Sequence, residues 1–262
     1  LPAAPLAYIG EPVAIKDPTA VTLRRQGGAN VLLVGQQEEA AMAILCWAMV
    51  SLAAQHPRSL ARFVVLDGSP VDSPLAGVLS KVKAALPHDV NMVEYRAVPE
   101  ALASLGEELA QRQANPDAHG PSVYVIIYGL QRYRALRHQE ESFSFSAGEQ
   151  EQKPQPDKLL ADLLREGPSL GIHVLTWCDT PASLERTLDR ASMREFDHRI
   201  LFQMSATDSS NLIDSPLANK LGFHRALAYS EEQGTLEKFR PYALPTAEFL
   251  KRVAERLSAR PS

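Results

Sequence analysis

The chain has 262 residues, of which 45% are hydrophobic and 22% charged, so it can hold one large α/β domain with a sizeable core or two small domains. Its formal net charge of −4 argues against a stand-alone nucleic-acid binder, because such proteins usually carry a basic excess. No apolar run reaches the length that a membrane span requires.

The predicted elements alternate between strands and helices. Residues 1–28 are interpreted as a linker and a strand that leads into a domain spanning 29–262. Strands are predicted at 31–35, 62–68, 91–96, 122–129, 171–177, 198–204, 226–230 and 236–242. Helices are predicted at 36–54, 75–86, 99–113, 158–166, 181–193, 208–213 and 246–258.

This alternation predicts an α/β fold with a mostly parallel sheet, helices on both faces and a C-terminal hairpin across 231–235. The segment 137–157 differs from its surroundings because it is rich in Gln, Glu, Ser and Pro and poor in branched apolar residues. Such a composition is typical of a flexible surface insertion.

Four stretches in the second half of the chain occur in a characteristic order and spacing. They are Gly171–Leu175 followed by Pro181, Arg199–Ser205, Asp208–Asp214 and Leu221–Tyr229. Over residues 31–242 the chain resembles the motor domain of the FtsK/SpoIIIE family, including the ATPase modules of EccC-type secretion proteins. The segment 12–23, followed by Ala29 and Asn30, resembles the strand that leads into tandem EccC-like modules. The resemblance implies a RecA-like P-loop NTPase fold, with ATP and Mg²⁺ as the cofactors of active relatives.

A phosphate loop needs the pattern G-x-x-x-x-G-K-[ST], whose glycines expose backbone N–H groups, whose Lys neutralises phosphate and whose hydroxyl binds Mg²⁺. The matching positions hold Gly35, Gln36, Gln37, Glu38, Glu39, Ala40, Ala41 and Met42. Only the first glycine remains, Ala41 stands in place of the Lys, and Met42 in place of the hydroxyl. Glu38 and Glu39 place negative charge where a triphosphate would lie, although carboxylates suit a helix N-terminus.

The resemblance puts the acidic motif, which binds Mg²⁺ and activates water, at the end of the strand 122–129. Those positions hold Tyr128 and Gly129, and neither binds a metal or accepts a proton usefully at neutral pH. The polar sensor, usually a Gln in the family, corresponds to Asp179. Three parts of the hydrolytic machinery are therefore missing, and we expect no catalytic residue, cofactor or metal in this domain.

Other polar residues each have a structural and a functional interpretation. Asp67 is expected to cap a turn rather than touch a ligand, and His173 to be a hydrogen-bonded core histidine. A basic cluster of Arg132, Arg134 and Arg137 could face DNA phosphate or an acidic partner, but a solvated face is favoured. Cys46 and Cys178 lack metal-type spacing, which predicts buried, reduced thiols and a cytoplasmic location.

Two further groups could serve a larger assembly. Arg186, Arg190, Arg194 and Arg199 lie in and after one predicted helix, and an arginine of a stacked ATPase module can reach a neighbour's γ-phosphate. The apolar residues Leu212 and Ile213 and the segment 217–223 could bind a partner peptide, although such residues more often pack a helix on the sheet.

Three functions remain open. The favoured one is a catalytically degenerate module of a multi-module DNA or protein translocase, serving assembly, regulation or substrate docking. The alternatives are an active DNA translocase with an unorthodox or neighbour-completed site, and a peptide-docking module of an EccC-type secretion motor. The expected partners are neighbouring ATPase modules or subunits, with DNA or a secreted-protein tail as cargo. The expected location is the cytoplasm, with any membrane association made through other parts of a longer protein.

Overall fold

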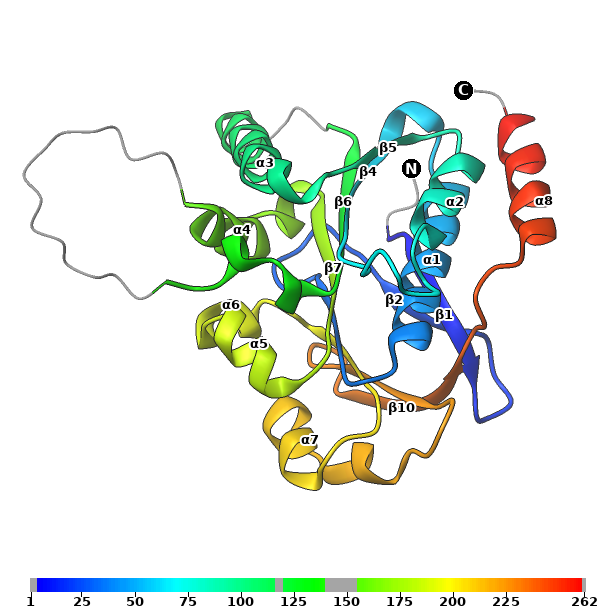
Figure 1. Cartoon of the computed structure of the whole chain (residues 1–262), viewed down its shortest axis with the longest axis vertical. Coiled ribbons are helices and arrows are strands. Elements are labelled where there is room, and N and C mark those ends of the chain that lie inside the picture. The colour runs from blue at the N-terminus through cyan, green and yellow to red at the C-terminus, as the bar shows by residue number, and fades with distance from the viewer. Residues whose placement is uncertain (1–3, 116–119, 140–154, 261–262) are drawn as a thin grey trace, which may run out of the picture.

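The computed structural model describes residues 4–115, 120–139 and 155–260, so most of the predicted insertion at 137–157 lies outside the described residues. In these ranges the chain forms one ten-stranded sheet between two layers of helices (Figure 1). The strand order is β2-β1-β10-β9-β8-β3-β7-β6-β4-β5.

The bounds of the elements agree closely with the predicted pattern for the central strands. The strands are β1 (Leu6–Pro12), β2 (Thr19–Thr22), β3 (Val31–Val34), β4 (Ala61–Asp67), β5 (Asp89–Met92), β6 (Ser122–Tyr128), β7 (Ile172–Cys178), β8 (His198–Leu201), β9 (Ala226–Ser230) and β10 (Thr235–Pro241). The helices are α1 (Glu38–Gln55), α2 (Val78–Ala85), α3 (Val98–Ala114), α4 (Pro156–Glu166), α5 (Pro181–Thr187), α6 (Arg190–Arg194), α7 (Ala206–Ile213) and α8 (Ala247–Ser258).

The sheet has a parallel half and an antiparallel half. The run β8-β3-β7-β6-β4-β5 is parallel throughout, and β3 lies between β7 and β8. The strands β9, β10, β1 and β2 continue from β8 in antiparallel pairs, and β9 with β10 is the predicted C-terminal hairpin. The predicted α/β class, with a mostly parallel sheet and helices on both faces, is therefore confirmed.

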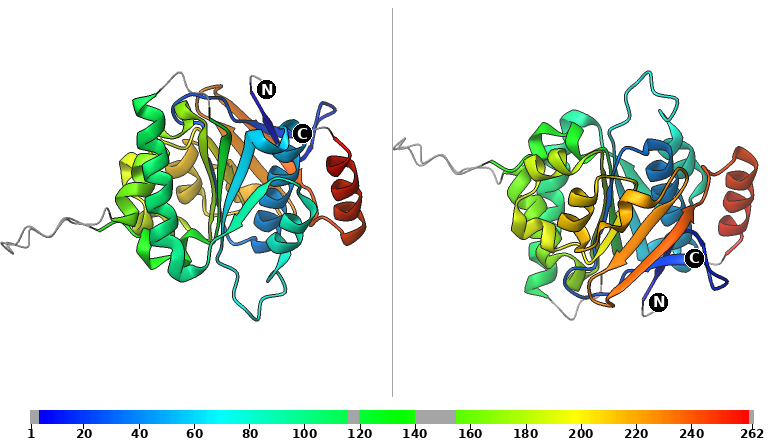
Figure 2. Two further views of the ribbon diagram at one scale, coloured as in Figure 1. Left: turned by 90° about the horizontal axis from the view of Figure 1, so that it is seen from above. Right: turned by 90° about the horizontal axis from the view of Figure 1, so that it is seen from below.

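Side chains of the central strands alternate between two cores, because successive residues of a strand point to opposite faces. Leu33 and Tyr124 face the core that contains α1, α2 and α8, whereas Leu32 and Val125 face the core that contains α3 and α4. Figure 2 shows the two helical layers on opposite sides of the sheet, with α8 outermost beside α2. The strands β3, β6 and β7 are buried at every position, which explains why their sequences are mostly apolar.

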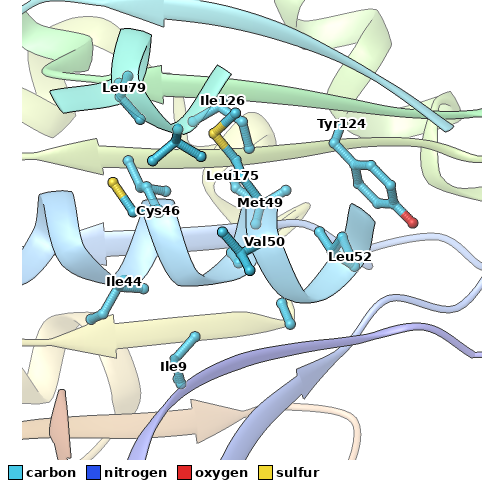
Figure 3. Close-up of a cluster of buried hydrophobic side chains, with 14 of the residues drawn as sticks. Ile9, Ile44, Cys46, Met49, Val50, Leu52, Leu79, Tyr124, Ile126 and Leu175 are labelled. Atoms are coloured by element: carbon cyan, nitrogen blue, oxygen red, sulfur yellow. The ribbon is translucent and has the colours of Figure 1, made fainter. Parts of the chain in front are cut away.

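Helix α1 is apolar on almost every side because it is enclosed on almost every side. Figure 3 shows Met49 of this helix turned toward Ile126 and Leu175 of the sheet, and Cys46 belongs to the same buried cluster. Its opposite side is covered by β1, whose Ile9 lies near Ile44 in the same view. Cys46 and Cys178 are buried free thiols, as predicted.

The beginning of the chain differs from the expectation of one strand at 12–23. Residues 6–12 and 19–22 instead form an antiparallel pair, and β1 also pairs with β10. The backbone of β1 passes so close to β10 that a Cβ on Gly10 would lie 2.2 Å from the carbonyl oxygen of Arg240. The amides of Leu6 and Tyr8 bind side chains of α1, so this strand belongs to the domain rather than to a linker.

The single helix predicted at 181–193 is wrong, because the chain forms α5 and α6 with a break between them. Leu188 is extended and buried, and Asp189 follows it as the N-cap of α6. The Asp189 carboxylate accepts a hydrogen bond from the amide of Ser192 at 2.8 Å, which satisfies a free donor of the new helix. Burial of Leu188 in the core thus overrides the continuous helical pattern.

Two strand boundaries were also displaced. The strand predicted at 91–96 lies at 89–92, because its parallel register with β4 begins at the Arg62–Asp89 pair and residues 95–97 form a 3₁₀ turn. The strand predicted at 198–204 ends at Leu201, where β3 also ends. Among the described residues, no helix combines the length and the apolar character needed to cross a bilayer.

Candidate functional site

The connection between β3 and α1 is too short to form an open phosphate loop. Strand β3 ends at Val34 and α1 begins at Glu38, so five residues of the segment 35–42 already belong to the helix. The amide of Ala41 donates to the carbonyl of Gln37 at 2.9 Å, as in any first helical turn. A phosphate loop curls the amides of four residues between its two glycines around an anion, whereas here α1 has already begun at the third of these positions.

Gly35 is the one glycine of this connection and its role is steric. It has a φ of 128°, and an added Cβ would lie 2.8 Å from the Cβ of Phe202. Its amide donates to the carbonyl of Cys178 and its carbonyl accepts from the indole of Trp177. Both backbone groups of Gly35 are therefore engaged by β7 rather than turned toward a ligand.

The positions that would carry a lysine and a hydroxyl face the core. Ala41 and Met42 are both 0% exposed, in the apolar cluster between α1 and the sheet. Glu38 and Glu39 are exposed at the helix N-terminus, where carboxylates complement the helix dipole. Gln37 is the N-cap residue, but its side chain does not bond the helix amides.

Tyr128 closes the space beside the N-terminus of α1. It ends β6, is buried, and its hydroxyl donates to the carbonyl of Glu38 at 3.3 Å. Its ring stacks on the indole of Trp177 with 4.7 Å between centroids and 25° between planes. Burial and the nearby Glu38 carboxylate raise the pKa of Tyr128, so its hydroxyl stays neutral.

Arg132 completes this arrangement from the turn that follows β6. Its Nη2 lies 2.8 Å from a carboxylate oxygen of Glu38, and its Nη1 donates to the carbonyl of Gly68 at 2.7 Å. Its guanidinium carbon lies 5.8 Å from the ring centroid of Tyr128 and 5.7 Å from that of Trp177. We call Glu38, Tyr128, Arg132 and Trp177 the closed cluster.

The predicted basic group after β6 is therefore not one solvated surface. Arg132 is 26% exposed and is held by the closed cluster, whereas Arg134 and Arg137 are exposed. Arg137 donates to the carbonyl of Gln131 at 3.3 Å, within the same turn. Gly129, which follows the end of β6, has a φ of 81° and allows the chain to turn there.

The remaining predicted site residues lie in structural roles. Asp67 accepts a hydrogen bond from the amide of Ser69 at 3.0 Å, so it caps the turn as expected. His173 is buried and its Nδ1 donates to the carbonyl of Ala29 at 2.7 Å. Burial lowers the pKa of His173 to about 4, so it is a neutral core histidine. Asp179 accepts from the hydroxyl of Thr180, the N-cap of α5.

Trp177 was missed by the sequence reasoning, although a signal for it existed. Tyr128 and Trp177 are direct partners in the parallel register of β6 and β7. Two aromatic residues at the ends of neighbouring strands would therefore have predicted a ring stack at this edge.

Three of the four arginines singled out earlier come together. Arg190, Arg194 and Arg199 line a groove of about 560 Å³ beside α7. Arg199 is bound there by the Glu231 carboxylate at 2.8 Å and the Leu212 carbonyl at 2.7 Å. Arg186 lies apart from them and donates to the hydroxyl of Ser183.

The predicted apolar surface is divided between core and solvent. Ile213 and Leu221 are buried, whereas Leu217 and Phe223 are 52% and 90% exposed. Phe223 borders a groove of about 760 Å³ at the N-terminus of α1. The other lining residues of this groove include Glu38, Glu39, His224, Arg225, Arg240 and Tyr242. Among the described residues, no three His, Cys, Asp or Glu side chains are placed to hold a metal.

The strand order and the helix that follows β3 define the α/β fold of P-loop ATPases. The resemblance to FtsK/SpoIIIE-type ATPase domains is confirmed for the fold by solved structures. The cytoplasmic domain of the type VII secretion ATPase EccC from Thermomonospora curvata superposes with a TM-score of 0.67 and 17% identity, over 97% of this chain and 31% of that one. No family model and no curated protein matches the sequence.

Two further structures show the same likeness. The pCW3 conjugation coupling protein TcpA, in a monomer form with ATPγS, has a TM-score of 0.67 and 14% identity over 97% of this chain and 70% of that one. Thermomonospora curvata EccC (ATPases 2 and 3), in complex with a signal sequence peptide, has a TM-score of 0.68 and 15% identity over 97% of this chain and 47% of that one. The chain thus spans less than half of each EccC chain.

Proposed function

We propose that this chain is a catalytically degenerate FtsK/SpoIIIE-like module of a multi-module DNA or protein translocase, serving assembly, regulation or substrate docking. The observation that carries the proposal is the closed cluster at the N-terminus of α1, where Tyr128 and Arg132 bind Glu38. In an active P-loop ATPase this helix end is left open for the β- and γ-phosphates.

Nucleotide binding would have to disrupt several contacts and would gain little in return. A triphosphate at this position would meet the carboxylates of Glu38 and Glu39 before it met any lysine. Ala41 and Met42 face the core, so their positions offer neither charge compensation nor a Mg²⁺ ligand. Phosphoryl transfer depends on positioned charge. Arg132 is already paired with Glu38, and Arg225 and Arg240 line the groove at this helix end from other segments of the chain rather than from the positions of the phosphate loop.

The proposed partners are neighbouring ATPase modules or subunits of the same translocase. This is supported by two of the solved structures that match the chain, one of EssC and one of EccC, because each is described as holding ATPases 2 and 3 of its protein. A module without its own chemistry can still transmit force or fix the spacing of active neighbours. In this proposal the module works in the cytoplasm, and other parts of a longer protein make any membrane contact.

Calorimetric titration of the chain with ATP and Mg²⁺ tests the proposal, and no saturable heat is expected. The Glu39→Gln variant is a folded control, because Glu39 makes no ion pair among the described residues. Micromolar affinity in the unmutated chain would overturn the proposal. Hydrolysis that appears only when a neighbouring module is added would instead favour a site completed between modules.

A peptide-docking role is the second candidate, and the exposure of Phe223 and Leu217 favours it. Both residues flank the turn that precedes β9, and Phe223 borders the groove at the N-terminus of α1. Exposed aromatic side chains beside a groove are typical anchors for a partner segment. Loss of peptide binding in Phe223→Ala, with unchanged thermal stability, would support this role. Peptide binding unaffected by that change would exclude it for this surface.

A further inference from the structure

A second pocket lies at the opposite end of α1 from the closed cluster. It has a volume of about 280 Å³ and is formed where the C-terminus of α1 meets the end of α8. Its polar lining comes from Gln55, His56, Arg58, His88 and Arg260, and Leu257 of α8 closes one side. The Gln55 amide is already bonded to the backbone of Leu6 and Ser51. His56 is the C-cap residue of α1, so the end of that helix fixes its backbone.

Three nitrogen atoms of this pocket are buried and have no hydrogen-bond partner. They are Nδ1 of His56, Nδ1 of His88 and Nε of Arg58. His56 and His88 are only 5% and 8% exposed, so bulk water does not satisfy these atoms. Buried polar groups in native proteins almost always have a partner, and three such atoms in one small pocket indicate an occupant.

The second nitrogens of the same side chains are already engaged, which fixes their orientation. His88 Nε2 donates to the carbonyl of His56 at 3.1 Å, and His56 Nε2 lies 2.8 Å from the hydroxyl of Tyr124. Arg58 Nη2 donates to the carbonyl of Ser258 at 2.7 Å, and Arg260 Nη1 donates to that of Ala54. These hydrogen bonds therefore hold the side chains, and with them the three unpartnered nitrogen atoms, in fixed orientations.

The charge of the lining identifies the kind of occupant. Two guanidinium groups and two imidazoles line the pocket, and no described lining residue is acidic. A metal cation would be repelled by Arg58 and Arg260 despite the two imidazoles. Neutral His88 already donates through Nε2, so its Nδ1 becomes a donor only when the ring is protonated. A tetrahedral oxyanion offers several acceptor oxygens to the two guanidinium groups and to protonated imidazoles.

We propose that this pocket binds one oxyanion of phosphate size, held by Arg58 and by the two imidazoles of His56 and His88. The site is separate from the closed cluster and does not depend on the loss of nucleotide binding. A bound anion would join η1 (Arg58–Leu60), the approach to β5 and the end of α8, three segments that otherwise meet only at this corner.

Binding should become tighter as the pH falls. Burial, the facing imidazole of His88 and the nearby Arg25 lower the pKa of His56 to about 4, and burial and Arg58 lower that of His88. Arg260 and the neutral hydroxyl of Tyr124 also face them, and buried His173, which stacks on Tyr124, interacts electrostatically with His56. A bound anion favours the imidazolium forms, so protonation and anion binding support each other.

Sulfate is the appropriate first probe, because its charge does not change near neutral pH, and inorganic phosphate is the second. Thermal unfolding is followed against sulfate concentration at constant ionic strength, in the unmutated chain and in Arg58→Gln. Sulfate stabilises most proteins by exclusion from their surfaces, so the difference between the two proteins is the readout. We expect Arg58→Gln to weaken sulfate binding by at least about tenfold, with a larger difference at pH 6 than at pH 8.

Arg165→Gln serves as the matched control, because Arg165 is a well-exposed arginine of α4 on the other face of the sheet. If Arg58→Gln does not fold, His88→Gln replaces it, and the ¹⁵N resonances of the imidazoles in the unmutated chain give a readout without mutation. Sulfate-dependent shifts of the His56 and His88 resonances would support the site. Equal sulfate responses in the unmutated chain and in Arg58→Gln would overturn it, as would unchanged resonances, and would leave ordered water as the occupant.

Discussion

The guanidinium of Arg132 lies 2.8 Å from the carboxylate of Glu38, although 94 residues separate them in the sequence. The contact joins the turn after β6 to the first turn of α1. These are the two places where a P-loop ATPase keeps its acidic motif and its phosphate loop. The pair therefore connects the two parts of the proposed lost site to each other.

Removal of Arg132 should destabilise the fold more than removal of its partner charge. Arg132→Ala loses the ion pair, the bond to the Gly68 carbonyl and the cover over Tyr128, for a cost of about 1–3 kcal/mol. Glu38→Gln, at a half-exposed position, should cost at most about 1 kcal/mol. Urea unfolding of both variants, with Glu39→Gln as the control, measures the difference. If neither variant changes the free energy of unfolding, the Arg132–Glu38 ion pair contributes nothing to stability.

Rebuilding the phosphate loop with Ala41→Lys and Met42→Thr should not produce an ATPase. Both positions are fully buried, so the lysine would place an ammonium group in the apolar core instead of beside a phosphate. The cost should be several kcal/mol, seen as a large fall in Tm. Glu39→Lys, at an exposed position of the same helix turn, is the control and should remain folded. A steady-state phosphate-release assay checks for turnover.

Turnover above that of the unmutated chain would contradict the proposed degeneracy. Water activation would then have to come from another carboxylate, such as Asp67 or Asp179. Each of them accepts one hydrogen bond at present, Asp67 from a turn amide and Asp179 from the Thr180 hydroxyl.

The protein should lose stability as the pH falls from neutrality. His173 has a pKa of about 4 in the folded chain, below the value of about 6.5 for an unfolded histidine, because it is buried. The unfolded state therefore binds the proton more readily, so the stability is complete above about pH 6.5. The free energy of unfolding then decreases by up to about 1.4 kcal/mol per pH unit as the pH falls toward 4.

Thermal unfolding between pH 8 and pH 5 measures this dependence. The His173→Leu variant should be less stable at neutral pH, because the Ala29 carbonyl loses its donor, but its Tm should depend less steeply on pH. A variant with the same pH slope as the unmutated chain would assign the effect to other histidines.

Binding to duplex DNA by the chain alone should be weak and should weaken further with salt. The net charge is −4, and of the three arginines after β6 Arg134 and Arg137 are the exposed ones, Arg137 with a 3.3 Å hydrogen bond to the Gln131 carbonyl. Fluorescence anisotropy with Arg134→Gln/Arg137→Gln tests their part, and Arg165→Gln is the control. Tight binding at physiological salt that survives the double change would contradict the expectation.

The central strands could be predicted because their signal is local. Runs such as 122–128 and 172–178 are mostly apolar and buried throughout, and burial on both faces needs no distant information. β1 could not be predicted in the same way. Its partner β10 lies at the other end of the chain, and its residues Ala7 and Ile9 alternate only briefly. Non-local pairing of this kind leaves little trace in a short segment.

The candidate site, like the fold, could be predicted only in part. The sequence alone shows that Ala41, Met42 and Tyr128 differ from the residues of the two motifs, because a motif is compared position by position. Their burial and the closure by Arg132 were not visible, because these depend on which side of α1 faces the sheet and on a contact across 94 residues. The break at Leu188 was likewise decided by the core rather than by helix propensity.

The position of β1 between β2 and β10 also has a consequence for the order of folding. Thr19 and Glu237, which share a 2.9 Å hydrogen bond, are 218 residues apart, so this half of the sheet has a very high contact order. During synthesis β1 can pair with β2 at once, but its other edge stays open until β10 has left the ribosome. We expect the parallel half to form first and the antiparallel half to close last, with an exposed strand edge as the species most prone to aggregate.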